Sequence, residues 1–533
     1  MTRTLVLLIF IAGALQAQSP ESKQAQADRI FGAFNTHTPG CAVGVEYRGV
    51  VVLKSGYGMA DLERNVPITA DTVFESGSVA KQFTAAALLL LAQEGKISLD
   101  DPVRKYLSEI PDYGTPLTIR HVMSHLSGLR DWRLIAAFSG IGEGSYVLSN
   151  QDLLRMAAKQ RGLNFTPGTA YSYTNTGFNI ATILIERALG NGKTFQEFTR
   201  EAIFEPLHMT HTRWRDNFRE VAPNRALAYG PAAGGGWIQQ TPIENIIGAG
   251  GMLSTVGDWL FWNENFAHPK VGGENLVKLQ QIPATLSNGK TITYAAGLVV
   301  STFEGLREVS HGGSTGGYRT WLGRYPDQGV SVAVMCNSAQ ANSTQLGRDV
   351  ARLWTGVIRA PKPAPVAADP VKLGELEGMY RRVRDNSAVE LHVKDGKVTM
   401  DPGGQLVPTG IASFSAGESQ VLFESGGFRV VTPDGDTVYE RVQPAHPSVP
   451  ELASLAGQYT SPETDAPLTV AAKDGELTLA IGSNPPVRLR PTFHDAFTMP
   501  AAAIRFVRDA DGKVTGLIAG DDRVWELRFS KIR

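Results

Sequence analysis

A stretch rich in apolar positions lies between Phe74 and Gly95, where the chain reads FESGSVAKQFTAAALLLLAQEG. From Val79 to Gln93 almost every residue is a good helix former, and alanine and leucine would occur on all sides of such a helix. A helix that is apolar all round is buried. We therefore predict a buried helix at this point of the chain.

Patterns typical of strands lie on both sides of this helix. Residues 41–60 (CAVGVEYRGVVVLKSGYGMA) predict two strands joined by a turn at Arg48-Gly49. Residues 310–338 (SHGGSTGGYRTWLGRYPDQGVSVAVMCNS) predict a meander of three strands. Between the two, the sequence is mostly helical from Pro102 to about Gly190. This part of the chain therefore combines helices and strands, and the length of 533 residues allows two or three domains in all.

The first residues have the order of a secretory signal peptide. Arg3 precedes an apolar run from Leu5 to Leu15, and small and polar residues follow. We expect residues 1–17 to be removed and the protein to be secreted or periplasmic. The run is too short for a stable membrane anchor, and no later segment is a candidate for one. A buried N-terminal strand or helix is the alternative interpretation.

The C-terminal third has a different composition. Residues 359–370 (RAPKPAPVAADP) are rich in proline and alanine and predict a stiff linker. Two similar segments follow, LEGMY ending at Tyr380 and LAGQY ending at Tyr459, each with a later Lys-Asp-Gly and short alternating strands. This repeat predicts two small all-β, barrel-like domains, over 371–443 and 450–533.

Charge and cysteine content narrow the possible partners. The 51 Lys and Arg residues almost balance the 52 Asp and Glu residues, and no basic block occurs. Nucleic acids and anionic membrane surfaces are therefore not expected as partners, whereas small molecules, peptides or neutral polymers are. Two cysteines, Cys41 and Cys336, are too few for a disulfide scaffold or a cysteine zinc site. Whether they form a bridge is open at this stage.

A lysine in the first turn of a buried helix needs an explanation. Burial of an ammonium group is costly unless the group is paired or neutral. Ser78 lies three residues before Lys81, so the two side chains would share a face as a nucleophile beside its base, near the positive end of the helix. A serine cap followed by a solvent-reaching lysine is the alternative. The same pattern at Ser287–Lys290 lies in a turn, and we interpret it as an exposed loop.

Two further segments could bring polar groups to a cleft. Residues 167–178 (PGTAYSYTNTGF) predict a loop that carries Tyr171, Tyr173 and Asn175. The strand that begins near His311 contains glycines, which a strand tolerates where another chain or a ligand approaches the backbone.

His121 and His125 lie one helical turn apart, but no glutamate or third ligand accompanies them. We interpret them as packing and capping residues. We expect neither a metal site nor a cofactor.

Taken in order, these segments resemble the motifs of the penicillin-binding protein and class C β-lactamase family of serine hydrolases. The Ser-x-x-Lys motif falls on Ser78 and Lys81, Tyr-x-Asn on Tyr173 and Asn175, and Lys/His-Thr/Gly-Gly on His311, Gly312 and Gly313. The Ser-Gly-Leu run at 127–129 and the Gly-Ala-Gly-Gly-Met run at 248–252 are also similar to the family. The resemblance covers about residues 25–358.

The resemblance implies an α+β fold. Its core would be a five-stranded antiparallel sheet, flanked by helices, built from the N-terminal hairpin and the C-terminal meander, with a helical lobe inserted between them. The first and last strands would be neighbours, which would place Cys41 near Cys336.

The resemblance also implies roles for the motif residues. Ser78 would attack a carbonyl carbon and form an acyl-enzyme, with Lys81 or Tyr173 as the base. Asn175 would bind substrate or orient Lys81. The backbone N–H groups of Ser78 and Ser314 would form the oxyanion hole. Gly312 and Gly313 would leave room for an extended substrate beside the strand.

His311 stands where most β-lactamases have a lysine, as in some DD-peptidases and D-aminopeptidases of the family. Histidine is largely neutral at pH 7, which argues against strong β-lactamase activity. The two C-terminal β-domains also resemble the layout of the D-aminopeptidases. These domains would stabilise the protein, mediate contacts in a homodimer, or send a loop into the cleft.

We therefore expect a secreted serine hydrolase that cleaves amide bonds in D-amino-acid-containing peptides, of the D-aminopeptidase or DD-carboxypeptidase type. A carboxylic-ester hydrolase or weak β-lactamase is one alternative. A β-lactam- or peptidoglycan-binding sensor without turnover is another.

Overall fold

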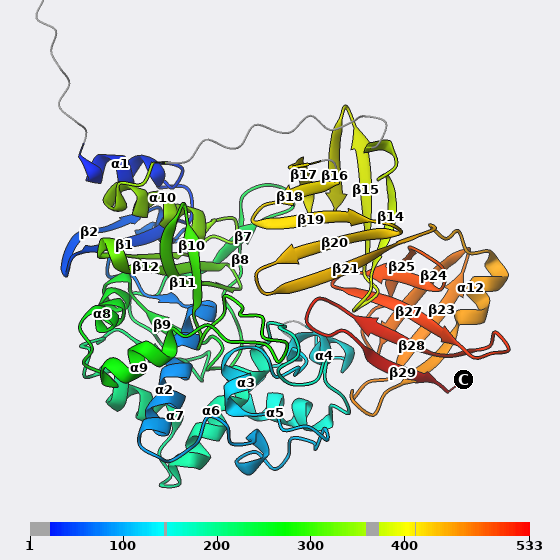
Figure 1. Cartoon of the computed structure of the whole chain (residues 1–533), viewed down its shortest axis with the longest axis horizontal. Helices are drawn as coiled ribbons and strands as arrows, with labels where there is room; N and C mark the ends of the chain where they lie inside the picture. The colour runs from blue at the N-terminus through cyan, green and yellow to red at the C-terminus, as the bar shows by residue number, and fades with distance from the viewer. Residues whose placement is uncertain (1–21, 143–145, 359–372, 411, 533) are drawn as a thin grey trace, which may run out of the picture.

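The computed structural model describes residues 22–142, 146–358, 373–410 and 412–532. The predicted signal peptide (1–17) and linker (359–370) lie outside the described residues. A main domain of helices around a sheet (residues 23–358) lies beside two β-barrels (Figure 1). Across the described ranges, no helix has both the length and the apolar character needed to span a bilayer.

The sheet of the main domain is antiparallel and has six strands, in the order β10-β11-β12-β13-β1-β2. They are β1 (Cys41–Tyr47), β2 (Val50–Tyr57), β10 (Val299–Phe303), β11 (Leu306–Thr315), β12 (Tyr318–Tyr325) and β13 (Val330–Cys336). The predicted number of five was wrong by one. The extra strand, β10, is a partly exposed edge strand with polar residues at Ser301 and Thr302, so apolar alternation does not mark it.

The predicted N-terminal hairpin is confirmed. Arg48 and Gly49 join β1 to β2, and both have positive φ angles, of 52° and 78°, as a tight hairpin turn requires. On its other edge β1 pairs with β13, so that the first and last segments of the sheet are neighbours. Cys41 lies opposite Cys336 in this register, and the two form a disulfide.

Helices cover both faces of the sheet (Figure 1). On one face, α1 (Lys23–Ile30) and α10 (Ser343–Thr355) share an apolar cluster with β1, β12 and β13. On the other face lie α2 (Lys81–Gln93), α8 (Val256–Ala267) and α9 (Gly273–Gln280). The central strand β1 is buried almost along its whole length as a result.

The predicted buried helix is α2. It begins at Lys81, because the preceding residues Gly77–Ala80 form a 3-10 turn, η1, that packs against β11 and β12. All residues from Lys81 to Leu89 are buried. Ser78 therefore lies on a turn that leads into the helix, wedged between the sheet and the helical lobe.

The helical lobe is inserted between the hairpin and the meander. Its elements are η2 (Val103–Lys105), α3 (Ile119–Met123), α4 (Trp132–Phe138), α5 (Asn150–Lys159), α6 (Asn175–Leu189), α7 (Phe195–Thr199) and the π-helix η3 (Arg200–Phe204). Short pieces complete the main domain: β3 (Met59–Asp61), β4 (Val66–Pro67), β5 (Phe74–Glu75), β6 (Arg213–Trp214), β7 (Tyr229–Pro231), β8 (Trp237–Gln239), β9 (Met252–Ser254) and η4 (Pro326–Gln328).

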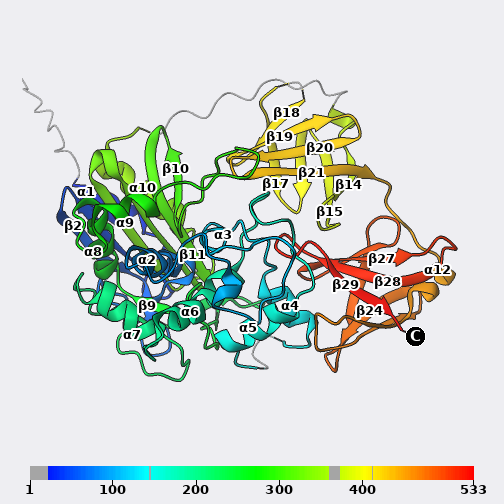
Figure 2. The same cartoon turned by 60° about the horizontal axis from the view of Figure 1, so that its bottom comes forward.

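Both predicted β-domains are closed barrels of eight antiparallel strands (Figure 2). The first barrel comprises β14 (Gly378–Arg382), β15 (Ala388–Lys394), β16 (Lys397–Asp401), β17 (Gly404–Pro408), β18 (Ser413–Ala416), β19 (Ser419–Glu424), β20 (Gly427–Thr432) and β21 (Gly435–Val442). After α12 (Val449–Leu455), the second barrel comprises β22 (Gly457–Thr460), β23 (Leu468–Lys473), β24 (Glu476–Ile481), β25 (Val487–Pro491), β26 (Ala496–Met499), β27 (Ala502–Arg508), β28 (Val514–Gly520) and β29 (Leu527–Lys531).

The two barrels differ in how their cores relate to the main domain. The first barrel encloses its own apolar cluster, centred on Phe414 and Phe428. The interior of the second barrel belongs to one apolar cluster with residues of α4, such as Phe138, and of α5, such as Leu153. The second barrel and the helical lobe therefore pack as one body.

Candidate active site

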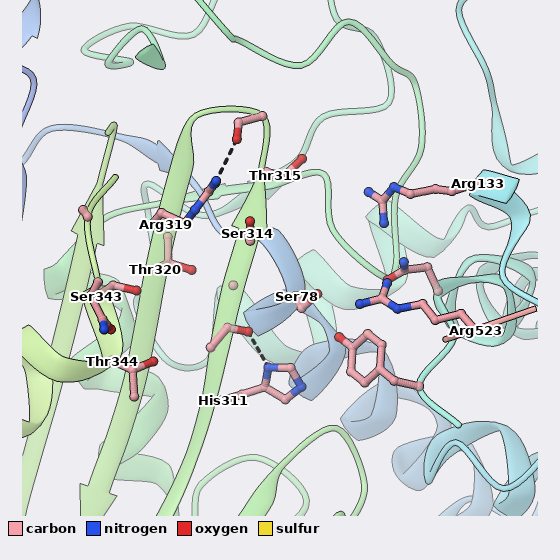
Figure 3. Close-up of a pocket in the computed structure, with 17 residues that line it drawn as sticks. Ser78, Arg133, His311, Ser314, Thr315, Arg319, Thr320, Ser343, Thr344 and Arg523 are labelled. Carbon is pink, nitrogen blue, oxygen red and sulfur yellow. Dashed lines mark hydrogen bonds between the residues drawn. The ribbon is translucent and has the colours of Figure 1, made fainter. Parts of the chain in front are cut away.

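A cavity of about 690 Å³ opens beside Ser78, between η1 and α4 on one side and β11 and β12 on the other (Figure 3). It is lined by residues of all three predicted motifs, including Ser78, Tyr173, Asn175 and His311. The residues that the sequence placed in separate segments therefore meet at one site.

Lys81 is fully buried beside this cavity. Its Nζ lies 3.1 Å from Ser78 Oγ, 2.9 Å from Asn175 Oδ1 and 2.9 Å from the carbonyl oxygen of Ala249. Burial holds the pKa of Lys81 well below its usual value; the nearby Arg133 acts in the same direction and Asp131 opposes it. The amine is therefore biased toward its neutral form.

The three partners of Lys81 differ in what they can accept or donate. The oxygens of Asn175 and Ala249 can only accept hydrogen bonds, whereas a serine hydroxyl can do both. A neutral amine has two hydrogens and one lone pair. It can donate to the two carbonyl oxygens and present its lone pair to the Ser78 hydroxyl, which is the arrangement of a base next to a nucleophile.

Asn175 is held in place by Asp131. The buried carboxylate accepts hydrogen bonds from the backbone N–H of Asn175 at 2.7 Å and from its side-chain amide at 3.0 Å. Because the amide nitrogen is engaged in this way, the amide oxygen is directed at Lys81. Asn175 is the first residue of α6, so the predicted loop is shorter than expected and ends at Thr174.

Tyr173 lines the same cavity as Ser78. Lys81 Nζ is 4.9 Å from the centre of its ring. Desolvation raises the pKa of Tyr173 above its usual value, while a hydrogen bond with Ser78 acts in the opposite direction. The phenol therefore stays protonated at neutral pH and can donate a proton next to Ser78.

His311 is buried at the edge of the cavity. Its Nδ1 lies 2.6 Å from the carbonyl oxygen of Gly312, which can only accept, so Nδ1 carries the hydrogen. Its Nε2 lies 3.0 Å from the Tyr294 hydroxyl. Burial lowers the pKa of His311 to about 4, so the ring is neutral at pH 7.

The two glycines after His311 have different surroundings. At Gly312 a Cβ would meet no atom closer than 3.7 Å, so that the strand is open there. At Gly313 a Cβ would lie 2.2 Å from the carbonyl oxygen of Ser76. Gly313 thus allows η1 to approach the strand, and the space on that side is filled by the backbone of Ser76.

Ser314 follows on β11, and both Ser78 and Ser314 line the cavity. Gly77 has a φ of +50°, and a Cβ there would lie 2.6 Å from the Ser314 nitrogen. The turn that carries Ser78 therefore lies directly against the backbone of Ser314. Ser78 and Ser314 are therefore neighbours at the wall of the cavity.

The histidines outside the motifs have packing and capping positions. The backbone N–H of Thr118 donates to His121 Nδ1 in the capping box of α3. His125 is buried among the rings of Tyr171, Tyr173 and Tyr294. Over the part of the chain that the structure describes, no group of three His, Cys, Asp or Glu side chains could hold a metal ion.

The second Ser-x-x-Lys copy is a loop, as predicted. Ser287 Oγ donates to the carbonyl oxygen of Gly168, and Lys290 contacts the first barrel. Within the described residues, no hydrogen bond joins Ser287 to Lys290 or to another lysine that could act as its base.

Sequence reasoning missed several residues at the site. Asp131 and Tyr294 orient motif residues, and three arginines line the cavity: Arg133 on α4, Arg319 on β12 and Arg523 between β28 and β29 (Figure 3). Asp131 lies two residues after the family-like run at 127–129, which could have drawn attention to it. Arg523 had no sequence signal, because it lies in the second barrel, far from every motif.

Comparison with known proteins was consistent with this geometry. The beta-lactamase family matches residues 27–353. A D-aminopeptidase of Cereibacter sphaeroides is 27% identical over 503 residues, which is 90% of this chain and 94% of the relative. A D-aminopeptidase of Brucella canis is 26% identical over 521 residues, 91% of this chain and 94% of that protein. The octameric penicillin-binding protein homologue from Pyrococcus abyssi shares the fold, with a TM-score of 0.57 at 22% identity over 86% of this chain and 98% of that one.

Proposed function

Since the chain belongs to the beta-lactamase family and is a serine hydrolase, we propose that it cleaves amide bonds next to D-amino acids through an acyl-enzyme on Ser78. The observation that carries this proposal is the fully buried Lys81. Its amine has two carbonyl acceptors and faces the Ser78 hydroxyl at 3.1 Å.

In the acylation step, Lys81 accepts the proton of Ser78 while Oγ attacks the carbonyl carbon of the substrate. The backbone N–H groups of Ser78 and Ser314 stabilise the oxyanion, a contribution of about 3 kcal/mol per donor in other enzymes. Tyr173 then donates its proton to the leaving nitrogen and regains one from Lys81. This division of roles follows from the two pKa directions, which favour a neutral amine and a protonated phenol.

In the deacylation step, a water molecule transfers a proton to Lys81 and attacks the acyl carbon. The Ser78 oxygen leaves and takes a proton back, which restores the starting state. Asn175 and Asp131 keep the lysine amine directed at Ser78 throughout. His311, held neutral, supports the strand edge and Tyr294 without adding a charge to the site.

The D-amino-acid specificity in this proposal is supported by the relatives. D-aminopeptidases match this chain over nine-tenths of its length, which is more than the main domain alone. We also propose that the protein is exported. The N-terminal order of charge, apolar run and small residues supports export, and so does the Cys41–Cys336 disulfide, which suits an oxidising compartment.

Steady-state assays would test the function. Wild type, Ser78→Ala and Ser287→Ala would be incubated with D-alanine p-nitroanilide, D-alanyl-D-alanine, p-nitrophenyl butyrate and a fluorescent penicillin. Ser287→Ala is the matched control, because it removes the serine of the second Ser-x-x-Lys copy. We expect kcat on the D-alanyl amides to fall at least about 10⁴-fold in Ser78→Ala and to be unchanged in the control.

Other results would contradict the proposal in distinct ways. Turnover of the ester alone would make the protein an esterase. Stoichiometric labelling by penicillin with no product from any substrate would make it a sensor. Equal activity in wild type and Ser78→Ala would remove Ser78 as the nucleophile.

A further inference from the structure

The cavity beside Ser78 is strongly cationic. Its described lining includes Arg133, Arg319 and Arg523 but no aspartate or glutamate. Glu244 lines the neighbouring cavities instead. A cavity with this charge attracts a negatively charged group.

The three arginines differ in what they bind. The guanidinium of Arg319 is engaged, since it donates to the carbonyl oxygens of Gly316 at 2.8 Å and Tyr318 at 2.7 Å. The guanidinium of Arg133 has no hydrogen bond or ion pair with a described residue. The guanidinium of Arg523 makes two long ion pairs, with Asp522 at 3.8 Å and Asp131 at 4.0 Å. It donates no hydrogen bond to either carboxylate, so its N–H groups can still bind a ligand.

Arg523 is held firmly, although its guanidinium is not hydrogen-bonded. The side chain of Asn164, in the main domain, donates to the carbonyl oxygen of Arg523 at 2.7 Å and accepts from the N–H of Trp525 at 3.0 Å. Within the turn, Asp521 accepts from the N–H of Arg523 at 2.8 Å. The backbone of this turn is therefore docked on the helical lobe, and its arginine points into the cavity (Figure 3).

The position of Arg523 indicates which part of a substrate it meets. Its guanidinium carbon is 5.0 Å from the ring centre of Tyr173, the residue assigned to protonate the leaving nitrogen. In an amino acid the α-carboxylate carbon is two bonds, or about 2.5 Å, from the nitrogen. A leaving amino acid with a free carboxylate would thus bring its charge to Arg523. Arg133, on the same side of the cavity, can share it (Figure 3).

We propose that Arg523 of the second barrel, together with Arg133, binds a free α-carboxylate on the leaving half of the substrate. The enzyme then releases a carboxyl-terminal amino acid, and D-dipeptides with a free carboxyl group are its preferred substrates. This inference rests on the proposed function and narrows it. It also makes the second barrel part of the active site, since the barrel supplies a substrate-binding residue.

A matched pair of substrates tests the inference. D-Alanyl-D-alanine and D-alanyl-D-alanine amide contain the same scissile bond and differ in the terminal carboxylate. Wild type is expected to prefer the free acid about 10- to 100-fold in kcat/KM, the range of a charge-assisted hydrogen bond. The preference should decrease with added salt.

Variants of Arg523 test whether this residue causes the preference for the free acid. In Arg523→Gln the ratio of free acid to amide should fall toward one, mainly through a higher KM for the acid, and Arg523→Lys should restore part of it. Arg488→Gln, an exposed arginine elsewhere on the second barrel, is the control and should keep the wild-type ratio.

The outcomes separate this inference from the proposed function. Equal cleavage of acid and amide by wild type, or an equal loss on both substrates in Arg523→Gln, overturns the carboxylate site and leaves the hydrolase intact. No cleavage of either substrate beyond the Ser78→Ala level overturns both.

Discussion

The two barrels have the same number of strands, and their sequences contain the same short repeat, but they contact the main domain in different ways. The first barrel touches it through polar side chains at its rim: Asp434 accepts from the N–H and hydroxyl of Thr293, at 2.6 and 2.7 Å, and Lys290 donates to the Thr432 carbonyl oxygen at 3.2 Å. Its apolar interior is its own.

The second barrel is joined to the main domain by its core. One apolar cluster runs from Trp132 and Phe138 into the barrel, and the ion pair between Arg130 and Glu463 is buried, with both side chains less than a tenth exposed. The barrel also sends Arg523 into the cavity. The same barrel fold thus occurs once as a separate module and once as a domain that lines the cavity. The difference lies in the interface with the main domain and in the loops, not in the fold.

The largest difference between the barrels should appear when an apolar side chain is removed from the core of each in turn. Phe529→Ala in the second barrel, whose ring lies 5.7 Å from that of Phe138, should lower the free energy of unfolding by about 4 kcal/mol. Because the cluster is shared, the main domain should unfold with the barrel and activity should be lost at a lower temperature.

The matched variant is Phe414→Ala, which opens a similar hole in the first barrel. It should destabilise that barrel by a comparable amount and leave the thermal inactivation of the enzyme nearly unchanged. Calorimetry together with residual-activity curves separates the two cases. Equal effects of both variants on thermal inactivation would contradict the difference between the barrels.

Removing the buried ion pair between Arg130 and Glu463 should lower the free energy of unfolding by a smaller amount. Glu463→Gln leaves the Arg130 guanidinium buried without its countercharge, which we expect to cost about 3 kcal/mol. Arg348 in α10 of the main domain pairs with Glu308 and with Glu418 of the first barrel, whose carboxylate is 80% exposed. Glu418→Gln removes only the exposed pair and should change stability little. Chemical denaturation measures both. A cost for Glu418→Gln as large as that for Glu463→Gln would argue against a special role of the second interface.

Much of the site, and the outline of the fold, could be predicted from sequence. The helix α2, the hairpin, the meander and both barrels have strong local patterns, and the motif residues Ser78, Lys81, Tyr173, Asn175 and His311 lie around one cavity and its wall. The edge strand β10 was missed because its half-exposed residues do not alternate.

What sequence could not predict depends on contacts between distant segments. Arg523 is a single arginine in a turn of a β-domain, and only the docking of that turn on Asn164 brings it to the cavity. The helix start at Asn175 was hidden because it depends on Asp131, which accepts from its N–H. The sequence alone did not distinguish Lys81 from Tyr173 as the base. The directions of their pKa shifts depend on how deeply each side chain is buried, which only the structure shows.

The main domain should become less stable as the pH falls, because His311 is buried in its neutral form. The pKa of His311 is lowered from 6.5 to about 4 by burial, so the unfolded chain binds more protons between these pH values. Its contribution to stability is complete above pH 6.5 and is lost as pH falls toward 4, by about 2 kcal/mol at pH 5. Denaturation at pH 8 and pH 5 measures this. A His311→Gln variant with the same pH dependence as wild type would contradict the assignment.

The smallest predicted effect concerns the rim of the first barrel. Asp434→Asn weakens two hydrogen bonds to Thr293 in a part-buried contact, which should cost about 1 kcal/mol and leave kcat/KM on D-alanyl-D-alanine unchanged. The measurement is a steady-state assay beside a thermal shift. A change in the free acid to amide ratio would show that the first barrel also reaches the site.

The most direct test of the account is to isolate the acyl-enzyme. Wild type would be quenched with acid during turnover of D-alanine p-nitrophenyl ester, digested and analysed by mass spectrometry, with Ser287→Ala and Ser78→Ala in parallel. We predict one added alanyl group on the peptide that contains Ser78, in wild type and Ser287→Ala but not in Ser78→Ala. Turnover with the alanyl group on another residue would contradict the role of Ser78.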